Sequence, residues 1–221
     1  MDIQLHYIEQ GTGMPLILLH GNGEDHTYFQ HQIDCFSKKY RVIAIDTRGH
    51  GDSPRGTAPF TIEQFADDLY HFMEAKSIAK AHILGFSDGG NIGLVFALQH
   101  PERVGKLILN GANLFPKGMK TSVYWWVLRH YWKAKWQNDK AQQEMMALML
   151  RQPHIAPESL AAVTAQTLIV VGNKDMIRER HTRLIHSHIK GSQLSIIEGS
   201  HFCASENHGT FNRLVGNFLE K

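Results

Sequence analysis

Six short apolar runs recur along the chain, and helical patterns lie between them. Each run is almost continuously β-branched or leucine-rich, which is typical of a strand covered on both faces of its sheet. Strands that alternate with helices predict parallel pairing through right-handed crossovers. The predicted strands are 15–20, 40–46, 81–86, 104–110, 167–172 and 193–198. The predicted fold class is therefore α/β, with a mostly parallel sheet flanked by helices.

The segments between these runs predict the covering helices. The clearest spans 62–77, where apolar residues form one stripe and Thr61 with Gln64 makes a capping box. Other predicted helices are 27–38, 88–99, 178–189 and 208–219. The run from Ile3 to Ile8 alternates between apolar and polar residues, which predicts an edge strand.

Residues 112–166 break this rhythm, because they contain no strand-like run and have a helical pattern. All four tryptophans lie there, between two predicted strands. We therefore expect a helical cap, 112–166, inserted into a core of 1–111 and 167–221, with one domain overall. The stretch from Leu114 to Arg151 carries a net charge of +5, whereas the whole chain carries +2. That charge would attract carboxylate-bearing substrates, or it is simply a solvated outer helix face.

Composition excludes several classes of function. A net charge of +2 gives no electrostatic case for a nucleic-acid partner. Cys35 and Cys203 lie far apart without metal-type spacing, so we expect free thiols in a reducing compartment and no metal. The first residues lack the pattern of a signal peptide, and no apolar run reaches the roughly 18 residues of a membrane span. These features predict a soluble, cytoplasmic protein with no membrane partner, and they leave the oligomeric state open.

A G-x-S-x-G motif at 85–89 marks a candidate nucleophile. A predicted buried strand enters the motif and a predicted helix leaves it, which is the context that such an elbow requires. The turn would raise the hydroxyl of Ser87 above the carboxyl end of the sheet, where ligands of open parallel sheets bind. The alternative is a glycine-rich turn with an ordinary serine.

A serine needs an adjacent base, and position selects one among the 15 histidines. His201 follows the last predicted strand and so lies at the same sheet edge as Ser87. The base needs a carboxylate on its other nitrogen, and Asp175 follows the neighbouring strand. The alternative role for Asp175 is that of N-terminal cap of the next helix.

An oxyanion requires two preorganised N–H donors. We assign these to the backbone N–H groups of Asn22 and Asp88, with Gly23 as the near alternative to Asn22. The carboxylate of Asp88 is expected to point to solvent at the helix start, where negative charge is favourable.

These segments resemble the α/β-hydrolase fold superfamily, specifically its serine-esterase-like branch with a small helical cap. The residues that carry the resemblance are 20–23 (HGNG), 46–53 (DTRGHGDS), 85–90, 172–175 (GNKD) and 199–202 (GSHF). The resemblance implies that Ser87 is the nucleophile, His201 the base and Asp175 the acid. It also implies that 46–53 is a structural loop, and that the chemistry needs no cofactor or metal.

The resemblance implies a small-molecule ester or acyl substrate, cleaved through an acyl-enzyme. Thioesterase, lactonase, C–C hydrolase and perhydrolase activities on the same triad stay open. So does a ligand-binding signalling protein of this fold that turns over slowly. The aromatic and methionine-rich cap suggests an apolar pocket, for which Trp125, Trp126, Met145 and Phe202 are the candidates. Packing of the cap onto the core explains the same residues without a pocket.

Overall fold

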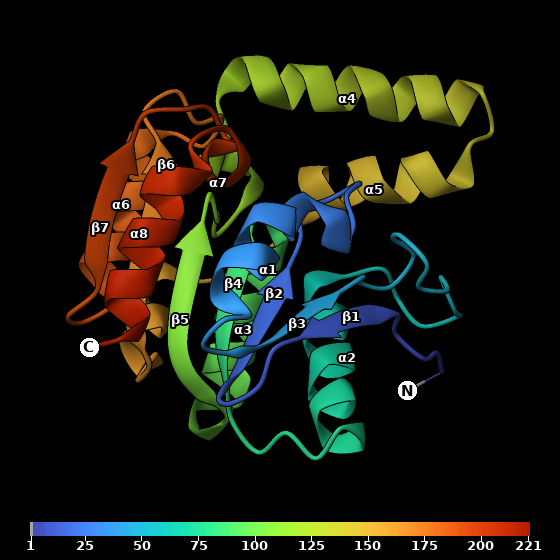
Figure 1. Cartoon of the computed structure of the whole chain (residues 1–221). Coiled ribbons are helices and arrows are strands. Elements are labelled where there is room, and N and C mark those ends of the chain that lie inside the picture. Colours follow the sequence, from blue (N-terminus) through green and yellow to red (C-terminus); the bar gives the residue numbers. More distant parts are fainter. Residues whose placement is uncertain (1) are drawn as a thin grey trace.

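The computed structural model describes residues 2–221 and has a seven-stranded sheet at its centre (Figure 1). The strand order is β1-β3-β2-β4-β5-β6-β7. Strands β2 to β7 pair in parallel, and β1 pairs antiparallel with β3 at one edge. The strands are β1 (Tyr7–Gln10), β2 (Pro15–Leu19), β3 (Arg41–Ile45), β4 (Ala81–Phe86), β5 (Val104–Asn110), β6 (Gln166–Gly172) and β7 (Gln193–Ile197). The predicted fold class is confirmed.

The described part of the chain has eight α-helices. They are α1 (Gln30–Phe36), α2 (Ile62–Ala75), α3 (Asp88–Gln99), α4 (Thr121–Trp136), α5 (Lys140–Arg151), α6 (Glu179–His188), α7 (Cys203–Glu206) and α8 (His208–Leu219). Of these, α2, α3 and α6 cover one face of the sheet and α1 and α8 the other. Four short 3-10 turns supplement them: η1 (His26–Phe29), η2 (Pro101–Arg103), η3 (Pro116–Gly118) and η4 (Pro157–Ala162).

Alternate residues of each strand supply two separate cores. Ile17 and Leu19 of β2 pack with α2, α3 and α6, whereas Leu16 and Leu18 pack with α1 and α8. Because both faces of the inner strands β2 to β6 are buried, these strands are largely apolar rather than alternating. The edge strand begins later than predicted: β1 starts at Tyr7, not at Ile3. Contacts from distant residues hold the preceding segment instead, since Asp2 accepts a hydrogen bond from Arg48 at 2.7 Å.

The loop after β3 is fixed by a buried ion pair. The guanidinium of Arg48 is fully buried and donates two hydrogen bonds, each 2.7 Å long, to the carboxylate of Asp68 on α2. The carboxylate of Asp46, at the start of the same loop, is also buried and hydrogen-bonded. These contacts explain why polar residues of 46–53 lie inside the molecule and support a structural role for this loop.

Helices α4 and α5 form a hairpin above the carboxyl ends of the strands (Figure 1). The residues between β5 and β6 contain none of the seven strands. Hydrogen bonds tie this segment to the rest of the molecule at Asn22 with Met145, Arg55 with Glu144, Ile62 with Gln152, and Arg178 with Met119 and Thr121. Within residues 2–221, no helix combines the length and apolar character that crossing a membrane requires.

Candidate active site

Ser87 lies at the sharp turn between β4 and α3. Its backbone has φ 53° and ψ −117°, a left-handed conformation that is strained for any residue with a side chain. The N–H of Ser87 donates to the carbonyl of Asn110 at 2.7 Å, so the neighbouring strand β5 holds the turn in place. Backbone strain that neighbouring structure holds in place in this way is typical of a functional position.

The glycines beside Ser87 are required by close backbone approach. A Cβ on Gly85 would lie 2.2 Å from the carbonyl oxygen of Gly89, and a Cβ on Gly89 would lie 1.9 Å from that of Leu19. Both contacts involve backbone atoms that cannot move independently. The sequence motif therefore reflects steric necessity at this turn.

The structure brings the three predicted triad residues together at the carboxyl ends of β4, β6 and β7. His201 Nε2 lies 2.9 Å from Ser87 Oγ, and His201 Nδ1 lies 2.8 Å from Asp175 Oδ1. His201 and Asp175 are only 4% and 5% exposed, which removes water from the bond between them. The N–H of Ile177 also donates to Asp175 Oδ1 at 2.7 Å. Because the residue that caps α6 is Arg178, Asp175 is not the cap of that helix.

Asn22 and Asp88 flank Ser87 from two different elements. Asp88 is the first residue of α3, so its backbone N–H has no acceptor within the helix. Asn22 lies in the turn after β2, and among residues 2–221 its backbone N–H finds no hydrogen-bond acceptor. The side chain of Asn22 donates to the carbonyl of Met145 on α5 at 2.8 Å. The same residue therefore joins the turn to the helical hairpin.

The expectation that the Asp88 carboxylate points to solvent is wrong. The side chain is buried and accepts a hydrogen bond from Asn91 Nδ2 at 3.0 Å, while Oδ2 has no partner among the described residues. Burial raises the pKa of Asp88 to about 6. The helix dipole correctly favours a carboxylate at the N-terminus of α3, but tertiary packing shields that N-terminus from water.

Replacing Asp88 with Asn should make stability less dependent on pH. The pKa of Asp88 is higher in the folded protein than in the unfolded chain. Between these two pKa values the folded protein keeps a proton that the unfolded chain releases, so the stability of the folded state falls as the pH rises. When the pH rises from about 4.5 to 7.5, the free energy of unfolding of the parent protein should fall by about 2 kcal/mol more than that of Asp88→Asn. Urea denaturation at several pH values measures this. The exposed Asp67→Asn is the control, and identical pH profiles for Asp88→Asn and the parent would contradict the prediction.

Glu24 is a neighbour of this site that sequence reasoning missed. Its Oε2 accepts a hydrogen bond from the N–H of Gly21 at 3.3 Å, in the turn that carries Asn22. Burial raises the pKa of Glu24 to about 7, and the nearby His201 opposes that rise. The only signal in the sequence is its place three residues after Gly21, which by itself does not reveal burial.

The predicted pocket residues divide into two groups. Phe202 packs beside the site, with ring centroids 5.6 Å from Phe86 and 5.8 Å from His201. Met145 is half-buried on α5, where its carbonyl meets Asn22. The structure does not bring Trp125 and Trp126 to the site, because they lie on α4 with 62% and 53% of their surface exposed. Helical periodicity separates the faces of α4 but does not say which of them packs against α5.

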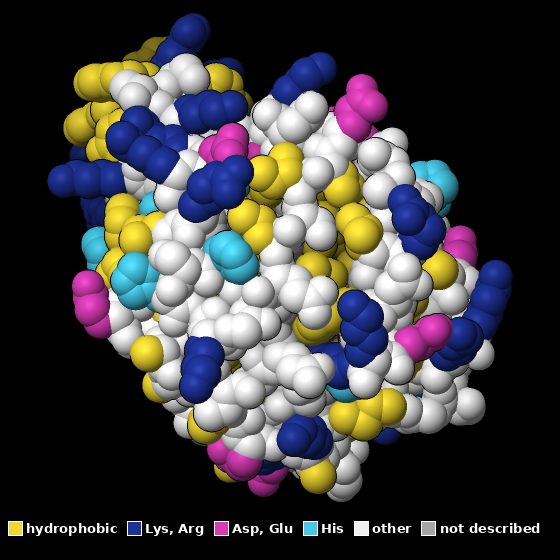
Figure 2. Space-filling view, turned by 90° about the vertical axis from the view of Figure 1, so that its left-hand side faces the viewer, with side chains coloured by type: hydrophobic (Ala, Val, Ile, Leu, Met, Phe, Trp, Pro, Cys, Tyr) yellow, Lys and Arg dark blue, Asp and Glu magenta, His cyan; other side chains and the backbone are white. Residues whose placement is uncertain are grey.

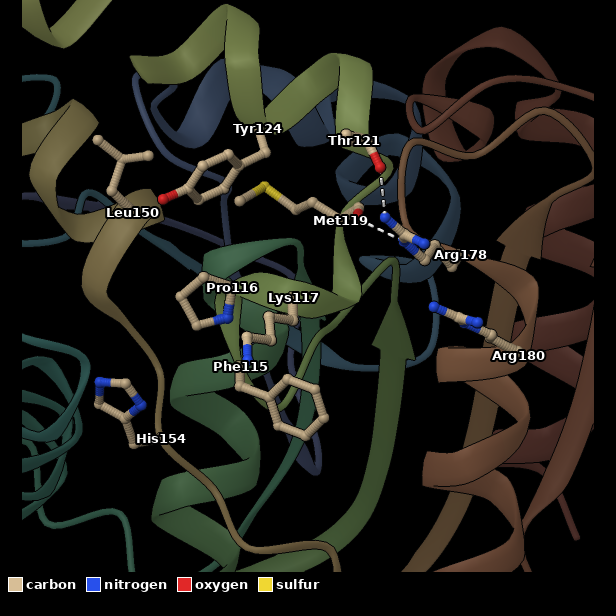
Figure 3. A pocket seen from close by; sticks show the side chains of 10 residues that line it. All are labelled: Phe115, Pro116, Lys117, Met119, Thr121, Tyr124, Leu150, His154, Arg178 and Arg180. Carbon is tan, nitrogen blue, oxygen red and sulfur yellow. Dashed lines mark hydrogen bonds between the residues drawn. The ribbon is translucent and has the colours of Figure 1, made fainter.

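A cavity of about 680 Å³ lies between the helical hairpin and the core. Figure 3 shows the ring of Tyr124 extending toward Leu150 at the upper side of the cavity, with Phe115 and Pro116 below and Arg178 to one side. Ser87, Asp175 and His201 are not among its lining residues. Arg178 donates to the carbonyl of Met119 at 2.8 Å and to Thr121 Oγ1 at 2.7 Å, so it fastens the start of α4 to the core.

One cluster of described residues has the composition of a metal site. Candidate ligand atoms of His6, His26 and Asp46 all lie within 4.8 Å of one another. However, Asp46 already accepts four hydrogen bonds, from His6 Nδ1, from the backbone and ring of His26, and from the N–H of Asp52. Because a carboxylate offers about four lone-pair sites, these bonds account for the cluster as a structural network.

Comparison with known proteins agrees with this geometry. Residues 14–148 match the model of the alpha/beta hydrolase fold family. The human protein "Serine hydrolase BPHL" is 30% identical over 249 residues, covering 99% of this chain and 84% of that protein.

Solved structures share the whole fold. The meta-cleavage product hydrolase from Pseudomonas fluorescens IP01 superposes with a TM-score of 0.84 at 24% identity, covering 99% of this chain and 94% of that one. A structure from a study of carboxylesterases of Nitrososphaera gargenis gives a TM-score of 0.85 at 22% identity, covering 99% and 94%. At these identities the structural likeness concerns the fold alone.

Proposed function

The chain belongs to the alpha/beta hydrolase fold family, and on that basis we propose that it is a serine hydrolase that cleaves a carboxylic ester of a small substrate. The observation that carries the proposal is the continuous chain Ser87–His201–Asp175, with contacts of 2.9 and 2.8 Å at the ends of three strands. The serine has a base within hydrogen-bond reach, and the base has an orienting carboxylate. This is the requirement for nucleophilic catalysis by an alcohol.

In the proposed reaction, Ser87 Oγ attacks the ester carbonyl while His201 Nε2 accepts the hydroxyl proton. Asp175 keeps the Nδ1 proton of His201 in place and stabilises the imidazolium. The backbone N–H groups of Asn22 and Asp88 donate to the oxyanion, and the start of α3 adds the positive end of its dipole. His201 then protonates the leaving alcohol, and water releases the acid from the acyl-enzyme by the reverse sequence.

The names of similar proteins leave the substrate bond open. They include a serine hydrolase, a meta-cleavage product hydrolase and carboxylesterases, together with proteins named as putative carbamate hydrolases. We favour an ester because the site holds a serine nucleophile and needs no further group to cleave one. Thioesters, lactones and C–C bonds are the competing substrates of the same machinery.

The deciding experiment is a panel of p-nitrophenyl esters of increasing acyl length, with matched thioesters and lactones, alongside labelling by a fluorophosphonate. We expect labelling at Ser87, located by mass spectrometry, and turnover that is fastest for short acyl chains. Labelling without turnover of any compound would favour a ligand-binding protein of this fold. No labelling of the folded protein would reject an activated Ser87.

A further inference from the structure

Helix α4 has two apolar faces, and only one of them is covered. Val127 and Ala134 are buried against α5, which is the main packing partner of α4 among the described residues. On the opposite side, Trp125, Arg129, Trp132 and Trp136 recur at intervals of four, three and four residues. That spacing aligns them along a single face of the helix, which we call the outer stripe.

The outer stripe exposes an unusual amount of aromatic surface. Trp125 is 62% exposed, Trp132 56% and Trp136 84%, and the adjacent Trp126 is 53% exposed. Together these side chains present on the order of 500 Å² to solvent. This sum is comparable to the area of the largest apolar patch on a typical monomeric protein, and such patches are often functional.

The surroundings of the outer stripe are basic. From Phe115 to Asn138 the sequence has no aspartate or glutamate, whereas Arg129, Lys133 and Lys135 lie on α4 itself. Lys135 Nζ sits 4.9 Å above the ring of Trp132. Figure 2 shows Lys and Arg side chains beside hydrophobic ones at the top of the molecule.

The hairpin of α4 and α5 carries two acidic side chains, and each has a partner of its own. Asp139 accepts a hydrogen bond from the N–H of Gln142 at the start of α5. Glu144 pairs with Arg55. Among the described residues, neither carboxylate forms an ion pair with a cation of α4.

We propose that the outer stripe docks on an anionic lipid surface. Tryptophan combines a large apolar ring with one polar N–H, which suits the boundary between lipid headgroups and acyl chains. Lysine and arginine around it are attracted to the negative surface potential of anionic lipids. A helix with indoles on one side and cations beside them lies in the plane of the interface rather than across it.

Charge argues against a second copy of the chain as the occupant. In a two-fold dimer the same patch would face itself, so each outer stripe would bring Arg129, Lys133 and Lys135 toward the identical cations. Lipid headgroups supply the missing negative charge. The sequence expectation of no membrane partner considered only spanning segments, and peripheral docking requires none.

Tryptophan fluorescence reports on the environment of α4 alone, because all four tryptophans of the chain lie within residues 125–136. We expect a blue shift when vesicles of phosphatidylcholine and phosphatidylglycerol, mixed in a ratio of about 2:1, are added. Cosedimentation should show binding at least about tenfold tighter than to pure phosphatidylcholine, with a loss at high salt.

Two variants separate the apolar contribution to vesicle binding from the electrostatic contribution. Trp125→Gln/Trp132→Gln/Trp136→Gln should weaken vesicle binding by at least about tenfold while Trp126 still reports on the helix. Arg129→Glu/Lys133→Glu should do the same for anionic vesicles. The matched control is Lys80→Glu/Lys190→Glu, which makes the same charge change at exposed sites away from α4 and should bind nearly as the parent does.

Several results would overturn the proposal. One is the absence of binding to anionic vesicles by a protein whose circular dichroism shows it to be folded. Another is an equal loss of binding in the control variant, which would indicate a nonspecific charge effect. A third is a concentration-dependent dimer in sedimentation velocity that the triple tryptophan variant abolishes, which would identify a second copy as the occupant.

Discussion

Ser87→Ala should lower kcat/KM for a short p-nitrophenyl ester by about 10⁴- to 10⁶-fold. The substitution removes the only oxygen within hydrogen-bond distance of His201 Nε2 among the described residues, and with it the acyl-enzyme. His201→Ala should cost a similar factor, and the double variant little more, because the residues of a triad act as one unit. Asp175→Asn should lose about 10⁴-fold, since an amide disturbs the tautomer of the imidazole.

Steady-state kinetics and circular dichroism together test this prediction. Ser159→Ala, which changes a partly exposed serine in η4, serves as the control and should retain parent activity. Folded Ser87→Ala that keeps more than a few per cent of parent turnover would reject Ser87 as the nucleophile. Additive losses in the Ser87→Ala/His201→Ala variant would contradict the coupling that the 2.9 Å contact indicates.

Asp68→Ala should destabilise the fold by about 3–5 kcal/mol. It leaves the guanidinium of Arg48, which is fully buried, without the two 2.7 Å bonds that compensate its desolvation. For a chain of this size the loss corresponds to a fall in Tm of about 10 °C. Chemical denaturation and calorimetry both measure it.

The ion pair between Glu179 and Arg183 provides the matched control. Both side chains are more than half exposed, so Glu179→Ala should change stability by no more than about 0.5 kcal/mol. Arg48→Met/Asp68→Leu should recover part of the stability, because it removes the buried charge along with its partner. A loss below about 1 kcal/mol in Asp68→Ala would show that Asp2 and the carbonyl of Arg55 can satisfy Arg48 without Asp68.

The strands of the sheet could be predicted well because the apolar runs that mark them are local features of the sequence. Parallel strands buried on both faces are apolar throughout, and the six predicted runs lie within about one residue of β2 to β7. The meeting of Ser87, Asp175 and His201 could be predicted as well, since each follows a parallel strand and such strands end at one edge. The prediction of an edge strand from Ile3 to Ile8 was wrong about where the strand begins, because alternation does not reveal that Arg48 holds the chain at Asp2.

Side-chain environments at the site could not be predicted in the same way. The burial of Asp88 and Glu24 depends on residues that are distant in sequence, so the raised pKa of each has no local signature. The outer stripe of α4 shows the same limit. Periodicity places Trp125 and Trp132 on a different face from Val127 and Ala134, but packing against α5 decides which face is buried.

In the proposed mechanism, the hydrogen bond from the side chain of Asn22 to the carbonyl of Met145 would make substrate admission and transition-state stabilisation interdependent, because the backbone N–H of the same residue donates to the oxyanion. If α5 moves away to admit a substrate, the turn that carries one proposed oxyanion donor loses its anchor at the same moment. Bond cleavage would then be confined to the closed enzyme, and exchange of substrate and product to the open one. Grafting a foreign cap onto this core would change more than selectivity, because without a matching acceptor for Asn22 the chemical step itself would slow.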